Sequence, residues 1–420
     1  MEQIKTFVKK VSVPSDKKTK QKEYLATGKL PIIDQGQALI GGYTNDETKT
    51  VVCDLPVIVF GDHTCCVKYI DFPFGAGADG IKVIKPNQDL LPKYLYYGMQ
   101  YLVLKLSDRG YGRHYQHLEK MMIYVPPIPE QEKIVSQIEE SLSQLDSAVE
   151  TLKKTKQQLE VYRQAVLKEA FEGKLTDLWR SKNHVICSEL VSTARSKRDK
   201  LIQNKKLRKL KYEWKDDISL PSIPDEWEYA QIGDIAWSIK DGPHYSPEYT
   251  ETGVPFITGG NVRPSGVDFD SAKRITPKLY EELSKRCKPE KGDMLYTKGG
   301  TTGIARLNTY DIEFSVWVHV AVIKYVDVLY PEYFQHVLNS PLCYQQSQKY
   351  THGVGNQDLG LTRMINIIFP LCSLDEQKQI VAELESRLSE CDSIEQTVNQ
   401  SLQQTEALRQ SILKQAFEEG

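Results

Sequence analysis

The sequence lacks an apolar run long enough to cross a membrane, although 40% of its 420 residues are hydrophobic. A membrane-spanning helix needs about 20 consecutive apolar residues. The first residues, MEQIKTFVKKV, also lack the continuous apolar stretch of a cleaved secretory signal. We therefore expect a cytoplasmic protein of two or three domains, because a chain of this length can bury several cores.

The eight cysteines form no CxxC pair, which argues against the common zinc and redox motifs. Cys65 and Cys66 are adjacent, but no second pair lies near them in the sequence. We interpret them as small, half-buried strand residues. We predict neither a metal site nor a cofactor.

Proline and glycine are both absent from residues 130–172 and 376–418, which are copies of each other 246 positions apart. The copies share EQ and IV near their start, RQ and LK further on, and AFE at their end. A repeat of this length indicates two copies of one module. Good helix formers fill both copies, so each is predicted to be one helix of roughly 60 Å, at 1.5 Å per residue.

Apolar residues in both copies recur at alternating steps of four and three, which is the pattern of a coiled coil. We expect the two helices to pair with each other in antiparallel fashion, with polar residues such as Lys156, Arg163 and Arg409 fixing the register. A coiled coil between separate molecules is the alternative. The predicted seam consists of Ile138, Leu142, Leu145, Val149, Leu152, Leu159 and Val166 in the first helix, and Leu384, Leu388, Val398, Leu402 and Ile412 in the second.

The net charge of −2 conceals a separation of charge along the chain. Residues 174–225 carry 13 Lys and Arg against 7 Asp and Glu, whereas residues 373–420 carry 4 against 10. Such a separation fits a protein that meets a polyanion with some segments and a protein partner with others. A solvated charged helix face explains the basic segment equally well.

Two longer blocks, rich in Tyr and β-branched residues, are predicted to be mixed α/β domains. In the second block, PFITGGNV, GDMLYT and HVAVIKYV indicate strands and PEYFQHVLNSPLCYQQSQ a helix, while VIVFGD, DGIKVIK and PKYLYYGMQYLVLKL follow the same order in the first. We predict an α+β fold with a pseudo-twofold internal repeat. The predicted boundaries are 1–128 for the first domain, 129–173 for the first helical region, 174–215 for a basic, partly helical linker, 216–372 for the second domain and 373–420 for the second helical region.

The loops that close the two domains differ in sequence while their scaffold is retained. Both supply the Arg, Lys, Asn and Gln side chains that contact phosphates and read base edges. A surface role is the alternative for every residue, and Asn356 and Gln357 fit a helix cap equally well. The candidate DNA contacts are Lys17, Lys18, Lys20, Lys22, His63, Arg109, Tyr111, Arg113, His114, Tyr115, His244, Tyr245, Lys298, Thr301, Thr302, Lys349, His352, Asn356 and Gln357.

Two glycine-rich segments do not fit nucleotide binding. Residues 75–80 match GxGxxG, but a strand pattern follows where the fingerprint needs a helix, so we predict a turn. Residues 298–303 lack the Gly-Lys-Ser/Thr ending of a phosphate-binding loop. We interpret them as a loop that presents Lys298, Thr301 and Thr302 to a DNA backbone, with a simple hairpin turn as the alternative.

The combination of these motifs resembles the specificity subunit of type I restriction-modification systems. The motifs are IPEQEKIV from Ile128, LDEQKQIV from Leu374, AFEGKLTDLWR from Ala170, LPSIPDEWEYAQIGDI from Leu220, DGPHYSPEY from Asp241 and GVGNQDLG from Gly353. The resemblance implies two target recognition domains, each reading half of a bipartite site on double-stranded DNA. It also implies a helical spacer that recruits two methyltransferase subunits and, through them, the restriction subunits.

The first domain departs from the family pattern because it lacks the stretch seen around Glu226 and Trp227. Its N-terminal edge is therefore expected to be shorter. Catalytic motifs are also missing: we find neither a methyltransferase Asn/Asp-Pro-Pro-aromatic loop nor the carboxylate-lysine set of a nuclease. We predict a non-enzymatic subunit, with a coiled-coil adaptor that binds no DNA and a self-sufficient DNA enzyme as the rivals.

The repeat also predicts how the subunits act together. Two unlike domains held at a set distance would read an asymmetric site of two words with a constant gap. The helices carry further apolar residues that could bury helices of two identical partners in a bundle. These residues are Val135, Val161, Leu167, Val381, Leu408 and Leu413.

Overall fold

A computed structural model describes residues 1–78, 80–106, 113–183, 189–214, 218–353 and 357–418. The chain divides into two compact units. Unit 1 comprises Met1–Thr155 and Gln396–Gly420, and unit 2 comprises Lys156–Glu395. Each unit contains one mixed domain and a part of each of the two long helices α3 (Ile128–Phe171) and α11 (Leu374–Glu418).

Unit 1 contains ten strands and two short helices besides its parts of the long helices, within the described part of the chain. They are β1 (Glu2–Gln3), β2 (Val8–Val11), β3 (Lys18–Thr19), β4 (Leu30–Ile33), β5 (Gly42–Thr44), β6 (Val57–Gly61), β7 (Val67–Ile70), β8 (Gly75–Gly77), β9 (Ile81–Pro86), α1 (Pro92–Val103), α2 (Tyr115–Leu118) and β10 (Met122–Ile123).

In unit 2 the end of α3 is followed by two helices of the basic linker and then by the second domain. Its elements are α4 (Asp177–Asn183), α5 (Leu190–Asn204), β11 (Glu228–Gln231), α6 (Ile232–Ile235), β12 (Ala236–Asp241), β13 (Val254–Ile257), β14 (Val262–Arg263), β15 (Gly266–Val267), β16 (Lys273–Ile275), α7 (Pro277–Ser284), β17 (Met294–Thr297), β18 (Ala305–Leu307), β19 (Ser315–Val316), β20 (Val320–Tyr325), α8 (Pro331–Leu338), α9 (Pro341–Tyr350), α10 (Leu361–Met364) and β21 (Ile368–Leu371).

The two domains share the topology of their central sheet. The strand order is β2-β9-β6-β7 in unit 1 and β12-β20-β17-β18 in unit 2, and every neighbouring pair is antiparallel. Apolar residues of these strands pack against α1 in unit 1 and against α8 in unit 2. A smaller sheet is also shared, because β4 pairs with β8 and β13 pairs with β19, both in parallel. The predicted repeat of the globular parts is confirmed at the level of topology.

The N-terminal edge of the first domain is completed by a very short strand. In unit 2, β11 follows Trp227 and pairs antiparallel with β21 over four residues. In unit 1, β1 takes the same place beside β10, and Glu2 and Gln3 pair with Ile123 and Met122. The shorter edge expected from the sequence is therefore built from the first residues of the chain.

Both long helices are continuous, as predicted from their lack of internal Pro and Gly. Pro129 stands in the first turn of α3, where its missing N–H is tolerated. Gly173, at φ +76°, ends the helix, and the backbone N–H of Lys174 donates to the carbonyl of Glu169. At the start of α11 the Ser373 hydroxyl accepts the backbone N–H of Glu376, an N-cap interaction.

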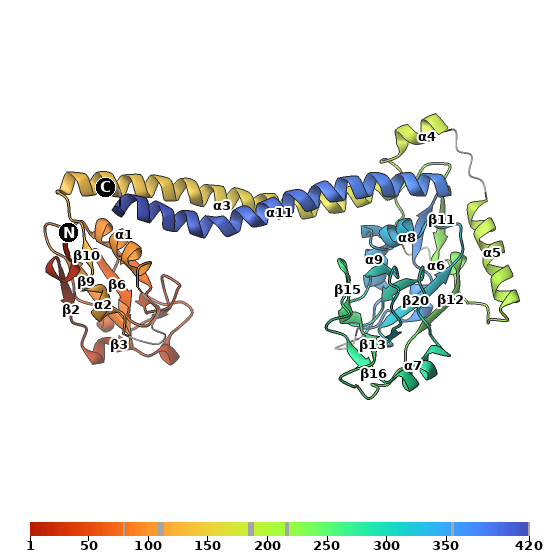
Figure 1. The fold of residues 1–420 in the computed structure, drawn as a ribbon, viewed down its shortest axis with the longest axis horizontal. Helices are drawn as coiled ribbons and strands as arrows, with labels where there is room; N and C mark the ends of the chain where they lie inside the picture. The colour runs from red at the N-terminus through yellow and green to blue at the C-terminus, as the bar shows by residue number, and fades with distance from the viewer. Residues whose placement is uncertain (79, 107–112, 184–188, 215–217, 354–356, 419–420) are drawn as a thin grey trace. The chain divides into compact units, whose positions relative to one another are not determined.

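Within each unit the two helical segments lie side by side and run antiparallel (Figure 1). Arg409 pairs with Asp146 in unit 1, and Arg163 pairs with Asp392 at 2.6 Å in unit 2. Because these residues are equivalent in the repeat, one interhelical ion pair occurs twice. The predicted seam residues Ile138, Leu142, Leu145, Val149, Leu152, Leu159, Val166, Leu384, Leu388, Val398, Leu402 and Ile412 are all buried or half-buried.

Two predictions of local structure need correction. The helix expected over PEYFQHVLNSPLCYQQSQ is divided into α8 and α9, because Pro341 lacks an N–H and Ser340 caps a new helix through the backbone N–H of Cys343. The glycine-rich residues Gly75–Gly77 form strand β8 and not a turn. The strand predicted to follow them is β9, so no helix N-terminus is available for a phosphate. Cys65 and Cys66 are half-buried as expected but precede β7.

A buried charge cluster fixes the start of α11 in unit 2. The Glu376 carboxylate, fully buried, accepts hydrogen bonds from Thr176 at 2.7 Å, from Arg180 at 3.0 Å and from the indole N–H of Trp227 at 2.9 Å. Thr176 and Arg180 belong to the LTDLWR sequence after α3. The equivalent residue in unit 1, Glu130, is exposed. In the described part of the chain, no helix is long and apolar enough for a membrane.

We predict that Glu376→Ala lowers the free energy of unfolding of unit 2 by about 3–5 kcal/mol, because it leaves the buried Arg180 without its carboxylate. The control is Glu390→Ala, at an exposed site on the part of α11 that belongs to unit 2, for which a change below about 0.5 kcal/mol is expected. Urea unfolding followed by tryptophan fluorescence reports on unit 2 alone, since all five tryptophans lie between residues 179 and 317. Equal effects of the two substitutions would contradict the cluster's role.

Candidate nucleic-acid interface

Loops from distant parts of the sequence meet at one end of the central sheet of unit 2. Strands β12 and β17 end there and β20 begins there, since Asp241 pairs with Ala321 and Thr297 with Val320. Residues 351–353 and 357–358 join them, because Gly299 and His352 each bridge to Asp358. The fold therefore brings the DGPHY and KGGTTG segments together with residues 351–353 and 357–358.

Lys298 is the centre of this loop cluster and does not reach solvent. Its side chain is 3% exposed and its ammonium lies 3.3 Å from Asp241 and 3.2 Å from Asp358. Arg286 also pairs with Asp241 at 2.8 Å. The prediction that Lys298 contacts a DNA backbone is wrong for this conformation, because the ammonium is used to join the loops. The same holds for Thr302, which is buried against Thr351 and Gln348.

The exposed side chains around Lys298 form what we call the unit 2 loop face: His244, Tyr245, Thr301, His352 and Gln357. The Gln357 carbonyl accepts the N–H of Gly300, which fixes its loop while its side chain remains exposed. The face thus offers imidazole, phenol, hydroxyl and carboxamide groups on a rigid support, the types of group that contact bases and phosphates. Lys349 is exposed nearby. Asn356 lies outside the described residues.

Trp317, His319 and Arg286 belong to the same cluster and were missed in the sequence. The indole N–H of Trp317 donates to the Tyr245 carbonyl at 3.2 Å, and its ring lies 4.6 Å from that of His319. Burial lowers the pKa of His319 below its ordinary value, and the charge of Lys298 lowers it further. His319 is therefore neutral near pH 7. Trp317, two residues before the HVAVIKYV segment, and His319, the first residue of that segment, were the only available signal.

The corresponding part of unit 1 places its predicted residues differently. His114 and Tyr115 are buried, and the Tyr115 ring packs against Phe60 at 5.8 Å between centroids. They are core residues and not DNA contacts, which corrects the prediction. The Tyr115 N–H and the His114 N–H both donate to Asp62. Arg113 is exposed, and Arg109 and Tyr111 lie outside the described residues.

The N-terminal lysines of unit 1 divide into two pairs. Lys20 and Lys22 are exposed, as a phosphate contact requires. Lys17 is half-buried and donates to the Thr48 carbonyl, and Lys18 is half-buried in β3. His63, in the turn after β6, is half-buried. Of these lysines, only Lys20 and Lys22 are exposed as contacts with a DNA backbone would require.

Three basic residues of the linker make polar contacts with the domain on which α5 packs. Arg198 is buried and donates to the Gly233 carbonyl and the Tyr212 hydroxyl. Arg195 pairs with Asp234 at 2.7 Å, and Lys197 pairs with Asp327 at 2.8 Å. These contacts hold α5 against the second domain, whereas Lys200, Lys206 and Arg208 are exposed. The expectation that this segment meets a polyanion therefore stays a prediction.

The long helices retain a few exposed apolar side chains. Of the six residues predicted to be spare, Val135, Leu167, Val381 and Leu413 are buried under the two domains, which corrects the prediction. Val161 and Leu408 are exposed, at 70% and 50%. Tyr162, which is equivalent to Leu408 in the repeat, is 44% exposed. Each unit thus carries an unburied large apolar residue at the same repeat position.

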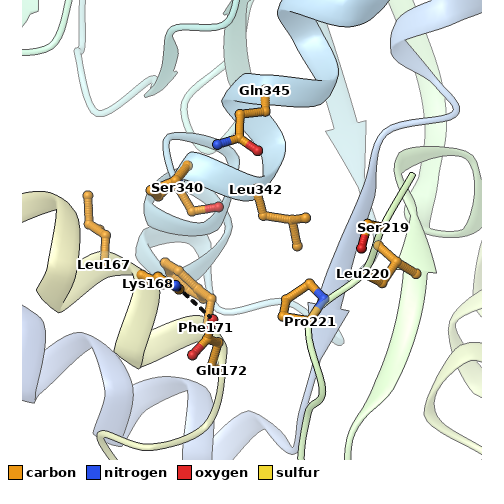
Figure 2. Close-up of a pocket in the computed structure, with 11 residues that line it drawn as sticks. Leu167, Lys168, Phe171, Glu172, Ser219, Leu220, Pro221, Ser340, Leu342 and Gln345 are labelled. Carbon is orange, nitrogen blue, oxygen red and sulfur yellow. Dashed lines mark ion pairs between the residues drawn. The ribbon is translucent and has the colours of Figure 1, made fainter. Parts of the chain in front are cut away.

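A hollow of about 310 Å³ lies in unit 2 where the end of α3 meets α9 and residues 219–221 (Figure 2). Phe171, Leu342 and Pro221 face it, and an ion pair between Lys168 and Glu172 lies at one rim. Its lining includes neither histidine nor cysteine, and Glu172 is its single carboxylate. This lining has no set of groups for nucleophilic or acid-base catalysis.

Comparison with known proteins identifies the class of this arrangement. The family model of the type I restriction modification DNA specificity domain matches residues 8–161 and 224–404. The EcoBI specificity subunit of Escherichia coli is 28% identical over 310 residues, which cover 71% of this chain and 58% of that protein. The E. coli EcoDI specificity subunit is 25% identical over 345 residues, covering 77% and 69%.

Two solved structures share the fold. The HsdS subunit from Thermoanaerobacter tengcongensis has a TM-score of 0.55 at 14% identity and covers 99% of this chain and 95% of its own. A chain from a study of complex assembly and conformational transition of the type I R-M system has a TM-score of 0.63 at 14% identity, covering 99% and 96%. The mixed fold with two long helices is thereby confirmed.

We predict that Lys298→Met lowers the free energy of unfolding of unit 2 by about 3 kcal/mol, because the buried Asp241 loses an ionic partner. A lysine that served only as a phosphate contact would leave stability unchanged. The exposed Lys278→Met is the matched control, with an expected change below about 0.5 kcal/mol. Urea midpoints of tryptophan fluorescence measure both, and an unchanged midpoint for Lys298→Met would contradict the burial of its charge.

Proposed function

Because the chain belongs to the family of type I restriction-modification DNA specificity proteins, we propose that it selects the DNA site for such a complex. Each domain reads one word of a bipartite site on double-stranded DNA. The observation that carries the proposal is the double match of the family model, which covers both domains with their adjoining helices. The chain spans 58% of the length of the EcoBI relative. The proposed activity therefore rests on the residues of this chain.

The two domains support the reading of two different words. They share the sheet order and the parallel pair of the smaller sheet, yet the loops at the end of the sheet differ. Unit 2 offers the loop face with Gln357 and His352, whereas unit 1 offers Arg113, Lys20 and Lys22. Different side chains on one scaffold select different base pairs. The site is therefore asymmetric, unlike the palindrome bound by a symmetric dimer.

The long helices support a fixed gap between the words. Each is uninterrupted over 44 or 45 residues, and the segments within each unit are joined by the equivalent ion pairs of Arg163 and Arg409. A complete intramolecular coiled coil of α3 and α11 would keep the number of unread base pairs constant. The proposal keeps the predicted boundaries: a first recognition domain at 1–128, a first helical region at 129–173, a linker at 174–215, a second recognition domain at 216–372 and a second helical region at 373–420.

The helices also supply the docking surface for the catalytic partners. They are acidic, and they expose Tyr162 in unit 2 and Leu408 in unit 1 at equivalent repeat positions. Equivalent surfaces bind two copies of one partner, here two methyltransferase subunits, which in turn bring the restriction subunits. Burial of these side chains in a helical bundle would stabilise the complex through removal of apolar surface from water.

We predict that Gln357→Ala reduces affinity for the cognate site about tenfold, within the range of 1–3 kcal/mol for a side chain that reads a base. The word read by unit 1 stays the same, because the change is confined to unit 2. The purified complex with methyltransferase subunits is used to map methylated sites, and gel shifts on cognate duplexes give the affinity. The exposed Gln345→Ala on α9 is the control. If the variant lost specificity for both words, or for neither, the proposal that the two domains read their words independently would be contradicted.

We predict that Tyr162→Glu and Leu408→Glu each remove one methyltransferase subunit from the complex, because a carboxylate at the exposed apolar position opposes burial. The double variant should bind none. Light scattering of complexes saturated with methyltransferase measures the mass, and the exposed Ser143→Glu serves as the control. A wild-type complex with a single methyltransferase would contradict the equivalence of the two surfaces.

A further inference from the structure

A glutamine at the start of each long helix has a side chain that is completely buried. Gln131 and Gln377 are the Gln of the two EQ motifs, and both are 0% exposed. Glutamine is mostly a surface residue, and a buried carboxamide is unfavourable unless its hydrogen bonds are made. Two such residues at equivalent repeat positions therefore require a common explanation.

Each carboxamide makes the same three hydrogen bonds. The Gln131 oxygen accepts the Leu91 N–H at 2.9 Å, and its NH2 group donates to the carbonyls of Asp89 at 2.7 Å and Pro126 at 2.8 Å. Both of its donors and one acceptor site are thus used.

In unit 2 the Gln377 oxygen accepts the Tyr330 N–H at 2.7 Å. Its NH2 group donates to the carbonyls of Val328 at 3.0 Å and Cys372 at 2.8 Å. Leu91 and Tyr330 each precede the proline that starts α1 or α8, and Asp89 and Val328 lie two residues earlier. Pro126 and Cys372 both lie five residues before the glutamine. The pattern of partners is identical.

We call each buried carboxamide a joint, because its three partners belong to separate segments of the chain. One segment enters the domain helix α1 or α8, the second connects the last strand to the long helix, and the third is the first turn of the long helix itself. All three bonds form at 2.7–3.0 Å only for one orientation of the long helix relative to the domain. An apolar side chain of equal size would fill the space without selecting an orientation.

Each domain is also held by the end of the other long helix. In unit 1 the Phe417 ring lies 5.1 Å from that of Tyr94, whose hydroxyl donates to the Tyr124 carbonyl at 2.8 Å. In unit 2 the Phe171 ring lies 5.5 Å from that of Tyr333, whose hydroxyl donates to the Pro370 carbonyl at 2.8 Å. These aromatic contacts hold the end of the helix against the domain by packing. The hydrogen bonds of the glutamines fix the orientation of the long helix relative to the domain.

We propose that Gln131 and Gln377 are positioning residues that set the angle between each domain and its long helix, and thereby the number of unread base pairs that the protein accepts. This inference rests on the proposed DNA-reading function. If both joints are rigid, the protein accepts only sites with one number of unread base pairs between the words. A domain free to tilt on its helix would also reach words one base pair nearer or further away.

The angle itself is tested without DNA. Spin labels on a genetically encoded ketone amino acid at the exposed positions Leu39 and Ser143 report the distance between the domain and α3 within unit 1. We expect Gln131→Met to broaden the distance distribution, and Gln137→Met, at an exposed site on the same helix, to leave it narrow. Gln131→Asn keeps the amide but shortens its reach, and is used if Gln131→Met loses its helical circular dichroism. An unchanged width would overturn the proposal.

The gap is tested with the complete methyltransferase complex. Methylation rates are compared on duplexes with the mapped gap and with gaps one base pair shorter and longer. We expect Gln131→Met and Gln377→Met each to reduce the ratio between correct and altered gaps about tenfold, as loss of about one buried hydrogen bond would. The words stay unchanged.

Broadened distances with an unaltered gap ratio would overturn the role in spacing while the words remained intact, and the proposed function would stand. A wild-type complex that recognises no words at all would instead overturn the proposed function and the spacing role with it.

Discussion

A fully buried carboxamide joins each mixed domain to the first turn of a long helix, and the rest of the structure is organised around these two joints. Gln131 and Gln377 each bind three backbone groups from separate segments. Because every donor is used, the arrangement tolerates little displacement. A protein that reads two separate DNA words, as proposed for this chain, needs such a constraint. Its specificity for one gap depends on the stiffness of the helices and joints that connect the two reading domains.

Charge is used mainly for internal cohesion in this molecule. Lys298 joins three loops through Asp241 and Asp358, Arg180 binds Glu376, and the basic linker pairs with acidic residues of unit 2. A buried lysine between two carboxylates fixes loop geometry, and the exposed groups around it are then free to vary. The proposed DNA-reading surface of unit 2 thus consists of polar side chains on a charged support, which differs from a continuous basic patch.

The repeat accounts for the proposal that one subunit carries two unlike reading domains and two like docking surfaces. The helices preserve their register over 43 residues, so Arg163 with Asp392 and Arg409 with Asp146 form the same contact twice. The loops at the end of the central sheet, by contrast, differ in sequence between the two domains.

The sequence by itself determined the repeat, the two uninterrupted helices, several strands and helices of the domains in their order along the chain, and the family, because helix propensity and hydrophobic periodicity are local properties. It also named the EQ motif but not its role. Only the tertiary structure decided that Lys298, Thr302, His114 and Tyr115 are buried, that Pro341 divides a helix and that Arg195 and Lys197 of the linker are paired. Burial and ion pairing depend on residues that can be 200 or more positions away, such as Thr176 and Glu376, and local patterns carry no record of such distant partners.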